Sequence, residues 1–537
     1  MKKLNILIPS LIGMFLLISL QSCTDHFEEL NTNPSSVSSD VVNPGFLFTQ
    51  SQREAVYDIP GEGSLKYFSG IEYSPSSGNI FYDSGYSYPY YTDELIAISD
   101  MIRLTDGDEV DLNRNAMGRI WKAWLFQNIT DRFGDIPYFE AVLDQNETVS
   151  HPAYDSQREI YVDLMAQLKQ AAEDLEVSDD RTTLGSQDLM YGGDVDSWIK
   201  FANSLRLRYA LRVRFADADL AQEQIDDVID EPMIENNDEN ALIMTKGEET
   251  PHTSNRHPMF NTWFNGPGNP ASCAHPVVSN MQAAGSPHGD LDIDDPRLSI
   301  YCDPARTDGG YRGRTINPAD GYDWYLQNRN VSLVGERFTE QSAQPIVVID
   351  YAEVQFNIAE ARLAGMANGD PQSAYQEGIR ASMEFYEVEE PEISDFLNST
   401  AGTLSGSDED QLRMISTQRY ISLFQQTQEA WTEWRRTGYP IQYVEETQPG
   451  HTSGEVPRRF TYPDVELSAN QESVQQAIAN LDGGDDLMSR IWWDARDGLP
   501  FDHPHADLSY PPPPDEDMTQ AEVEDMIIDL ELEDDDE

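Results

Sequence analysis

Apolar side chains recur every three or four residues in several segments, which is the spacing of one face of an α-helix. One of these segments opens with Ser156-Gln-Arg-Glu159, a pattern typical of a helix-capping box. Another is followed by Gly134 and Pro137, which indicate a helix end, since glycine accepts a positive φ and proline blocks continuation. The pattern predicts helices over residues 117–131, 156–175, 196–209, 218–230, 349–366, 371–387 and 409–435.

The middle of the chain, about 232–345, has a different character. Gly, Pro, Asn and His are frequent there, as in Asn265-Gly-Pro-Gly-Asn-Pro270. Long irregular segments inside a compact domain are usually functional. Elsewhere, short turns join the predicted helices in pairs, which is typical of stacked helix hairpins. We therefore expect a mainly α fold, in which a helical domain carries a loop-rich irregular lobe.

Both ends of the chain read as segments outside this fold. Met1-Lys-Lys3 and the interrupted apolar run to Leu20 predict a secretory signal over residues 1–22. Cys23 then stands where a bacterial lipoprotein is acylated, and this placement is favoured over a transmembrane helix. Residues 24–50 are predicted to be an extended tether, and the acidic residues 501–537 a disordered tail after a main domain of residues 23–500.

Composition adds a strong negative charge to this picture. The 537 residues carry 96 acidic and 35 basic side chains, a net charge of −61 at neutral pH. Such a surface excludes nucleic acid as a ligand, because phosphates need Lys and Arg. Only seven of the basic residues are lysine. Acid-rich, lysine-poor surfaces suit concentrated salt, where repulsion is screened, so we expect a salt-loving source.

The cysteines and histidines of the middle segment are candidates for a disulfide and for a metal site. With Cys23 lipidated, Cys273 and Cys302 remain as a candidate disulfide pair, which an exported location permits. His252, His257, Cys273 and His275 match no standard metal-ligand spacing. The sequence therefore predicts neither a metal site nor a cofactor.

Aromatic residues in the irregular segments are the candidate ligand contacts. Sugar rings bind flat apolar faces rimmed by Asn, Asp and Arg. These aromatics lack helical periodicity, so a core role explains them less well than it explains the helical aromatics, although packing between loops or against a partner stays an alternative. The candidates are Tyr86, Tyr88, Tyr90, Tyr91, Trp263, Phe264, Trp324 and Tyr325.

Charged residues on the apolar helix faces are better explained by structure than by chemistry. Arg206 and Arg208 are predicted to pair with acids or to cap backbone carbonyls, and Arg435-Arg436 and Arg458-Arg459 to form ion pairs. Glu353 and Glu360, seven residues apart on one helix face, are an alternative cation site, but pairing with these arginines explains them better. The chain lacks Gly-x-Ser-x-Gly, His-Glu-x-x-His and phosphate-loop motifs. A carboxylate pair for glycoside hydrolysis would arise by chance among so many acids, so we expect no enzyme.

Several segments, taken in order, resemble the SusD/RagB family of outer-membrane lipoproteins. They are Asp25-His-Phe-Glu-Glu-Leu-Asn31-Thr-Asn-Pro34, Ile120-Trp-Lys-Ala-Trp124 with Asp131-Arg-Phe-Gly-Asp-Ile-Pro-Tyr138, Trp198-Ile-Lys-Phe-Ala-Asn-Ser-Leu-Arg-Leu-Arg208, Asp295-Pro-Arg-Leu298, Asp350-Tyr-Ala-Glu353 to Ala361, Thr417-Gln-Arg-Tyr420, Glu429-Ala-Trp-Thr-Glu-Trp-Arg-Arg436, Pro457-Arg-Arg-Phe460 and Trp492-Trp-Asp494. The resemblance runs from Cys23 to about Asp494 and departs from the family in the acidic tail and extreme charge.

This resemblance implies a fold and a role. The implied fold contains tetratricopeptide-like helix hairpins. The implied role is to capture a nutrient, usually a glycan and in some members a peptide, and to deliver it to a SusC-like TonB-dependent transporter at the outer membrane. A surface glycoside hydrolase on a helical scaffold is the alternative, and a structural or adhesive surface protein is a third hypothesis.

Overall fold

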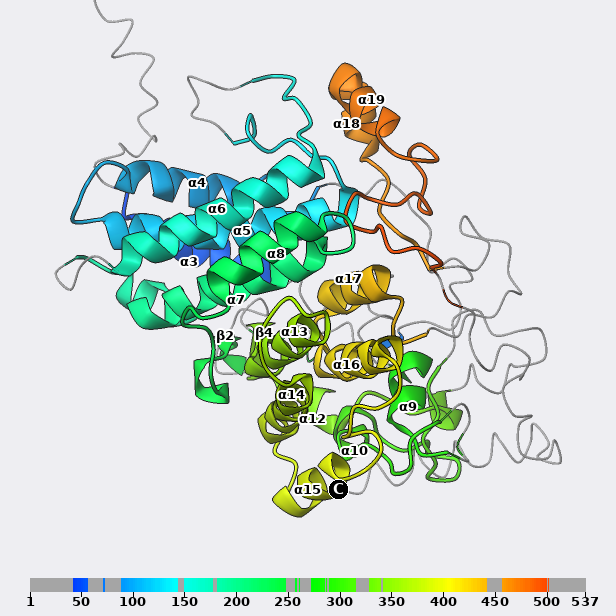
Figure 1. Ribbon diagram of the computed structural model, residues 1–537. Helices are drawn as coiled ribbons and strands as arrows, with labels where there is room; N and C mark the ends of the chain where they lie inside the picture. Colours follow the sequence, from blue (N-terminus) through cyan, green and yellow to red (C-terminus); the bar gives the residue numbers. More distant parts are fainter. Residues whose placement is uncertain are drawn as a thin grey trace, which may run out of the picture.

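The structure is a computed structural model, and its element order can be followed in Figure 1. It describes residues 42–56, 71–72, 88–142, 149–176, 181–247, 256–257, 260, 272–284, 286, 289–314, 328–339, 341–441, 456–499 and 501. The predicted signal segment, Cys23 and all but the first residue of the predicted tail lie outside the described residues. Phe501, that first residue, packs its ring 5.2 Å from the ring of Tyr439.

The N-terminal half of the described chain is a stack of helices (Figure 1). Neighbours along the chain pack against each other, so that each buries the apolar face predicted by its sequence period. The long α5 is buried along most of its length in the middle of the stack. The helices are α3 (Pro44–Ala55), α4 (Glu94–Thr105), α5 (Leu112–Phe133), α6 (Gln157–Glu176), α7 (Val195–Val213) and α8 (Ala218–Val228).

A second helical group follows later in the chain and contacts the first through α7 and α13. Within it, α13 and α14 form a tight hairpin, because Gly378 lets the two helix backbones approach across the ring of Phe356. The helices are α13 (Tyr351–Leu363), α14 (Pro371–Phe385), α15 (Glu390–Leu397), α16 (Asp408–Ser422) and α17 (Thr427–Thr437).

The predicted irregular lobe contains only short elements among its described residues. Its helices and strands are α9 (His275–Met281), α10 (Leu298–Tyr301), α12 (Glu336–Thr339), β2 (Ala241–Met244) and β3 (Ser272–Cys273), with β4 (Pro345–Ile349) beginning at its end. Strand β1 (Ile71–Glu72) comes from an earlier part of the chain. Strand β2 pairs antiparallel with β4, and β1 pairs antiparallel with β3. Two last helices, α18 (Asp464–Ala469) and α19 (Gln471–Ala479), lie beside the end of the first stack (Figure 1). The fold is mainly helical, as predicted.

Local sequence signals account for several helix ends. At the start of α6, the Ser156 hydroxyl accepts a hydrogen bond from Glu159 N, and the Glu159 carboxylate accepts from Ser156 N. At the end of α5, Gly134 has a φ of +88°, so the predicted helix stop is confirmed.

Two predicted segments are wrong in detail. The helix expected over 409–435 is divided into α16 and α17, and Gln425 between them has a φ of +76°, which an α-helix does not accommodate. The tether expected over 24–50 overlaps α3, which begins at Pro44. Asn43 caps this helix by accepting a hydrogen bond from Gly45 N at 2.9 Å.

Among the described helices, none combines the length and apolar character needed to cross a membrane. The largest hydrophobic cluster fills the first stack and reaches β2, β4 and α17. Two smaller clusters lie between α9, α10 and α16, and inside the α13–α14–α15 group. These clusters hold the irregular lobe against the second helical group.

Candidate functional site

The predicted aromatic contacts fall in three segments of the sequence, around residues 81–91, 263–264 and 324–325. Described residues that flank these segments are joined by backbone pairing. Ile71 lies opposite Cys273 in the β1–β3 ladder, Ser272 bridges to Leu333, and Ala274 bridges to Arg314. We call this set of pairings the strand knot. It collects chain segments from three distant parts of the sequence at one place in the irregular lobe.

Five of the predicted ligand contacts are not described by the structure. Tyr86, Trp263, Phe264, Trp324 and Tyr325 lie outside the described residues. The knot residues stand within about ten residues of Phe264, Tyr325 and the start of the tyrosine-rich segment at Phe81, a span of at most about 35 Å of chain. The described residues that flank these segments in the sequence are therefore paired with one another.

Cys273 and Cys302 form a disulfide, with their Cα atoms 6.0 Å apart. Both cysteines are fully buried in the cluster that packs α9 and α10 against α16. Cys302 also bridges to Val334 in the backbone. The disulfide thus fastens α10 to the strand knot.

The described tyrosines of the first aromatic segment pack on the helical stack. Tyr90 is only 4% exposed. The Tyr88 hydroxyl donates to the Tyr154 hydroxyl at 2.9 Å, and its ring meets Phe133 edge-on at 4.7 Å. The Tyr91 hydroxyl donates to the carbonyl of Pro137. For Tyr88, Tyr90 and Tyr91 these contacts favour the packing alternative over ligand binding.

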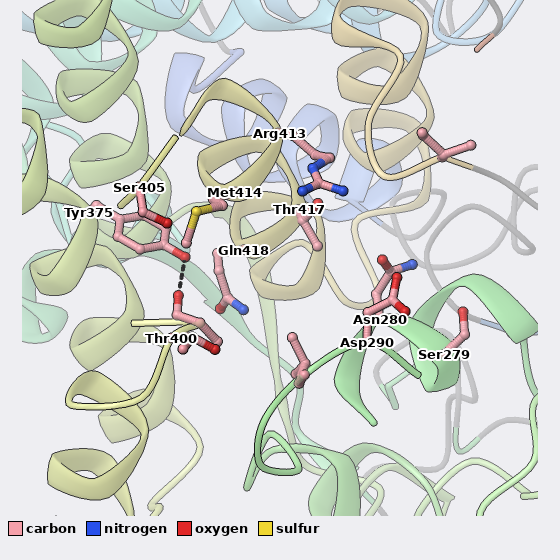
Figure 2. Close-up of a pocket in the computed structure, with 13 residues that line it drawn as sticks. Ser279, Asn280, Asp290, Tyr375, Thr400, Ser405, Arg413, Met414, Thr417 and Gln418 are labelled. Carbon is pink, nitrogen blue, oxygen red and sulfur yellow. Dashed lines mark hydrogen bonds between the residues drawn. The ribbon is translucent and has the colours of Figure 1, made fainter. Parts of the chain in front are cut away.

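A cavity of about 260 Å³ opens between α16 and the segment that follows α9 (Figure 2). One wall belongs to α16 and carries Arg413, Met414, Thr417 and Gln418. The opposite wall carries Ser279 and Asn280 from α9, and Asp290 and Leu291 from the loop beyond it, while Tyr375, Thr400, Ala401, Ser405 and Ile441 complete the lining. We call it the α9–α16 pocket.

Gln418 presents a fixed hydrogen-bond donor to this pocket. It is 3% exposed, and its Oε1 accepts a hydrogen bond from Arg297. Arginine only donates, so the carbonyl oxygen of the amide has to face Arg297, and the amide NH₂ faces away from it. Arg297 is itself fixed, since Nε donates to Asp295 Oδ1 at 3.0 Å and Nη1 donates to Ser382 Oγ at 2.8 Å.

The predicted arginine pairs are buried ion pairs. Arg206 pairs with Asp227, Arg208 with Glu353, Arg436 with Glu360 and Glu433, Arg458 with Asp494, and Arg459 with Asp485. Arg435 instead stacks on Trp431, 3.4 Å from the ring centroid, and donates to the carbonyl of Arg458 at 2.9 Å. Their role is structural, because each of these arginines is buried and has a partner, although the Asp227 carboxylate is 37% exposed.

Cys273 is not available as a metal ligand for the histidine-rich segment, because its sulfur is bonded to Cys302. The described residues contain no group of three or more His, Cys, Asp and Glu side chains placed to hold a metal ion. His252 lies outside the described residues. Burial lowers the pKa of His257 to about 3, so its imidazole is neutral.

The α9–α16 pocket was missed by sequence reasoning, which treated the 409–435 segment as core. The sequence does contain a signal for this pocket, because the polar Gln418 interrupts the apolar helix face formed by Leu412, Ile415 and Ile421. A buried polar residue is more informative than an exposed one. The opposite wall carries no such signal, since Asn280 and Asp290 lie in an irregular segment rich in polar residues.

A protein-family model described as starch-binding and associating with the outer membrane, SusD-like, matches residues 46–463. A search of curated protein sequences gave no match. Solved structures do match. A SusD homologue from Bacteroides fragilis is 24% identical with a TM-score of 0.71, covering 84% of this chain and all of that one.

Two further solved structures have names that mention a ligand. One is named a chitin-binding protein; it is 23% identical with a TM-score of 0.71, covering 84% of this chain and all of that one. Another is named a chitin-binding SusD homologue from Flavobacterium johnsoniae; it is 24% identical with a TM-score of 0.65, covering 84% of this chain and 97% of that one. At these identities the likeness establishes the shared fold.

Proposed function

The chain belongs to the SusD-like family, and from that premise we propose that it captures a glycan outside the cell and delivers it to a SusC-like TonB-dependent transporter. The family match over residues 46–463, with its starch-binding description, is the observation that carries this proposal. A peptide ligand is the alternative within the same role.

The strand knot supports a glycan site built from the aromatic segments. Glycans bind weakly to any single ring, so a site needs several aromatic faces held near one another. The strand knot pairs described residues that lie within about fifteen positions of Tyr86, Trp263, Phe264, Trp324 and Tyr325 in the sequence. We assign the glycan contacts to these five residues.

A lipid on Cys23 is the second part of the proposal. The basic start, the apolar run and the cysteine that follows Ser22 are the features expected of a lipoprotein signal. The acyl chains would hold the protein at the outer membrane beside its transporter. Metabolic labelling with a palmitate analogue tests this: the natural chain takes up the label, and Cys23→Ser does not.

Hydrolysis of the glycan has little support in the α9–α16 pocket. Glycoside hydrolysis uses a pair of carboxyl groups. Asp290 is the single carboxylate in the described lining of this pocket. The family description likewise names binding, so we propose binding without chemistry on the ligand.

Calorimetric titration of a panel of glycans and peptides, in about 1 M salt to screen the net charge, tests the function. We expect one glycan class to bind. Trp263→Ala or Trp324→Ala should weaken the affinity for this glycan about tenfold or more, because loss of a stacked ring costs on the order of 1–3 kcal/mol of binding free energy. Phe46→Ala is a matched control, because this aromatic on α3 is 68% exposed.

Two outcomes would contradict the proposal. If neither tryptophan variant has a lower affinity for a glycan that the natural chain binds, the site assignment is wrong. If a glycan is cleaved during the incubation, and a single carboxylate substitution abolishes cleavage, the hydrolase alternative replaces capture. Co-purification of the natural chain with a large β-barrel receptor from detergent-solubilised membranes tests the transporter.

A further inference from the structure

The α9–α16 pocket has an arrangement of donors and acceptors that the glycan site of the aromatic segments does not explain. Its donors lie on α16 and its acceptors lie on the opposite wall (Figure 2). The two walls therefore select for different chemical groups on a ligand.

Arg413 supplies the cationic donor on the α16 wall. It forms no hydrogen bond or ion pair with the described residues, in a chain of net charge −61. The nearest acid on its own helix is Asp410, one turn before it, but that carboxylate accepts hydrogen bonds from Ser407 N at 3.0 Å and Ser407 Oγ at 2.7 Å in the capping box of α16. The guanidinium of Arg413 interacts electrostatically with Asp410, but no hydrogen bond joins the two, so its N–H groups remain available to an anion.

Gln418 supplies a neutral donor on the same wall. Arg297 holds its oxygen, so its NH₂ group points away from Arg297 and has no acceptor among the described residues. Thr417 lies between the two donors, and its hydroxyl also makes no hydrogen bond with the described residues. An arginine fork and an amide NH₂ that line the same pocket can each donate to an oxygen of a carboxylate.

The opposite wall of the pocket carries oxygen atoms that can accept hydrogen bonds. Asn280 Nδ2 donates to the carbonyl of Pro276 at 2.7 Å, which leaves its Oδ1 as an acceptor. The Ser279 hydroxyl donates to the carbonyl of His275 at 2.8 Å, so its oxygen can accept as well. Asp290 adds a carboxylate on this wall. Acceptors gathered in this way favour a ligand that carries hydroxyl groups.

We propose that the α9–α16 pocket binds one carboxylated sugar unit, a hexuronic acid, with its carboxylate on Arg413 and Gln418 and its hydroxyls on Asp290 and Asn280. The side chains of Met414 and Leu291 offer apolar contact to the C–H face of the ring. The volume of about 260 Å³ suits a single ring. This inference rests on the proposed function, since it takes the ligand to be a sugar.

Calorimetry on the mature chain with D-glucuronate, D-glucose and L-glutamate tests the proposal in about 0.15 M salt, where the Debye length is about 8 Å. We expect glucuronate to bind and glucose to bind at least tenfold more weakly. Arg413→Ala should weaken glucuronate tenfold or more. Arg306→Ala is the matched control: it removes an equally exposed arginine that does not line the pocket, and should leave binding unchanged.

Gln418→Glu is the second variant, chosen to keep the fold. Its carboxylate retains an oxygen for Arg297 but replaces the donor that faces the pocket with a negative oxygen, so glucuronate should bind at least tenfold more weakly while the thermal midpoint is unchanged or higher. Glucuronate binding that is absent in the natural chain, or unaffected in Arg413→Ala, would overturn the proposal. So would tighter binding of glutamate, which would assign the pocket to amino acids.

The two proposals fail separately. The affinity of the Trp263 and Trp324 variants for neutral glycans tests the aromatic site. If that site binds and glucuronate does not, only the hexuronic acid inference is wrong. If no glycan of the panel binds but Arg413 and Gln418 control glucuronate binding, the pocket stands and the proposed capture of neutral glycans falls.

Discussion

Glu360 on α13 and Arg436 on α17 form a bidentate ion pair in which Nη1 donates to Oε1 and Nη2 donates to Oε2, each at 2.6 Å. The Glu360 carboxylate also contacts Arg419, and Arg214 Nε lies 2.8 Å from Oε1. Burial opposes the ionisation of Glu360, but these three arginines outweigh it and hold its pKa well below the usual value. One carboxylate thus joins four helices of both helical groups.

We predict that Glu360→Gln lowers the free energy of unfolding by about 3–5 kcal/mol, because it leaves buried arginines without their counter-charge. Denaturant unfolding followed by circular dichroism measures the change. Glu173→Gln is the matched control, since Glu173 is exposed on α6 and its loss should change stability by less than about 0.5 kcal/mol. Equal stabilities of the two variants would refute a stabilising role for the ion pair.

Asp350 is predicted to make stability fall as the pH rises from about 4 to 7. Burial raises the pKa of this N-cap carboxyl to about 7, against a hydrogen bond from Glu353 N at 2.8 Å. Between the unfolded pKa of about 3.9 and the folded value, the unfolded chain loses its proton and the folded chain keeps it. The folded state therefore loses up to about 4 kcal/mol over this window.

Asp350→Asn isolates that contribution, because asparagine caps a helix as well as aspartate does and carries no charge. The variant should match the natural chain at pH 4 and exceed its unfolding free energy at pH 8. Denaturant titrations at both pH values measure the difference. Parallel pH profiles of the two proteins would show that Asp350 is ionised in the folded state.

Removing the disulfide is predicted to cost stability and glycan binding together. Cys273 and Cys302 are 29 residues apart, and closing a loop of that length stabilises the folded state by about 3–4 kcal/mol. The bond also fastens the strand knot, so Cys273→Ala/Cys302→Ala should weaken glycan binding. Thermal unfolding and titration measure both effects. Reductant should lower the midpoint of the natural chain and leave the double variant unchanged.

Gly378→Ala is predicted to destabilise the α13–α14 hairpin. A Cβ at this position would stand 2.8 Å from the ring of Phe356, and overpacking of this kind costs about 1–3 kcal/mol. Phe356→Leu in the same chain should restore part of the loss by making room for the methyl group. If Gly378→Ala is as stable as the natural chain, the backbone approach does not depend on this glycine.

Local patterns in the sequence predicted the elements that depend on neighbours along the chain. Helix α6 begins one residue after the capping serine, Ser156, and α14 begins at Pro371, as the apolar period indicates. The buried arginines were also predictable, because a charge on an apolar helix face needs a partner. Such features follow from residues only a few positions apart.

The features that the sequence did not predict depend on contacts between distant segments. The break at Gln425, where φ is +76°, comes without a Gly or Pro signal in the sequence. The α9–α16 pocket joins residues more than about 100 positions apart, and its donors become visible only when Arg297 fixes Gln418. The burial of Tyr88 and Tyr91 likewise depends on Tyr154 and Pro137.

The strand knot also has a consequence for the order in which the chain folds. Strands β1 and β3 are about 200 residues apart, and pairing across such a distance pays a large loop-closure entropy before it gains any contact. The helices between them depend on local contacts and can form first. We therefore expect the helical stack to form before the strand knot closes, and the irregular lobe to be the last part of the chain to acquire its native backbone pairing.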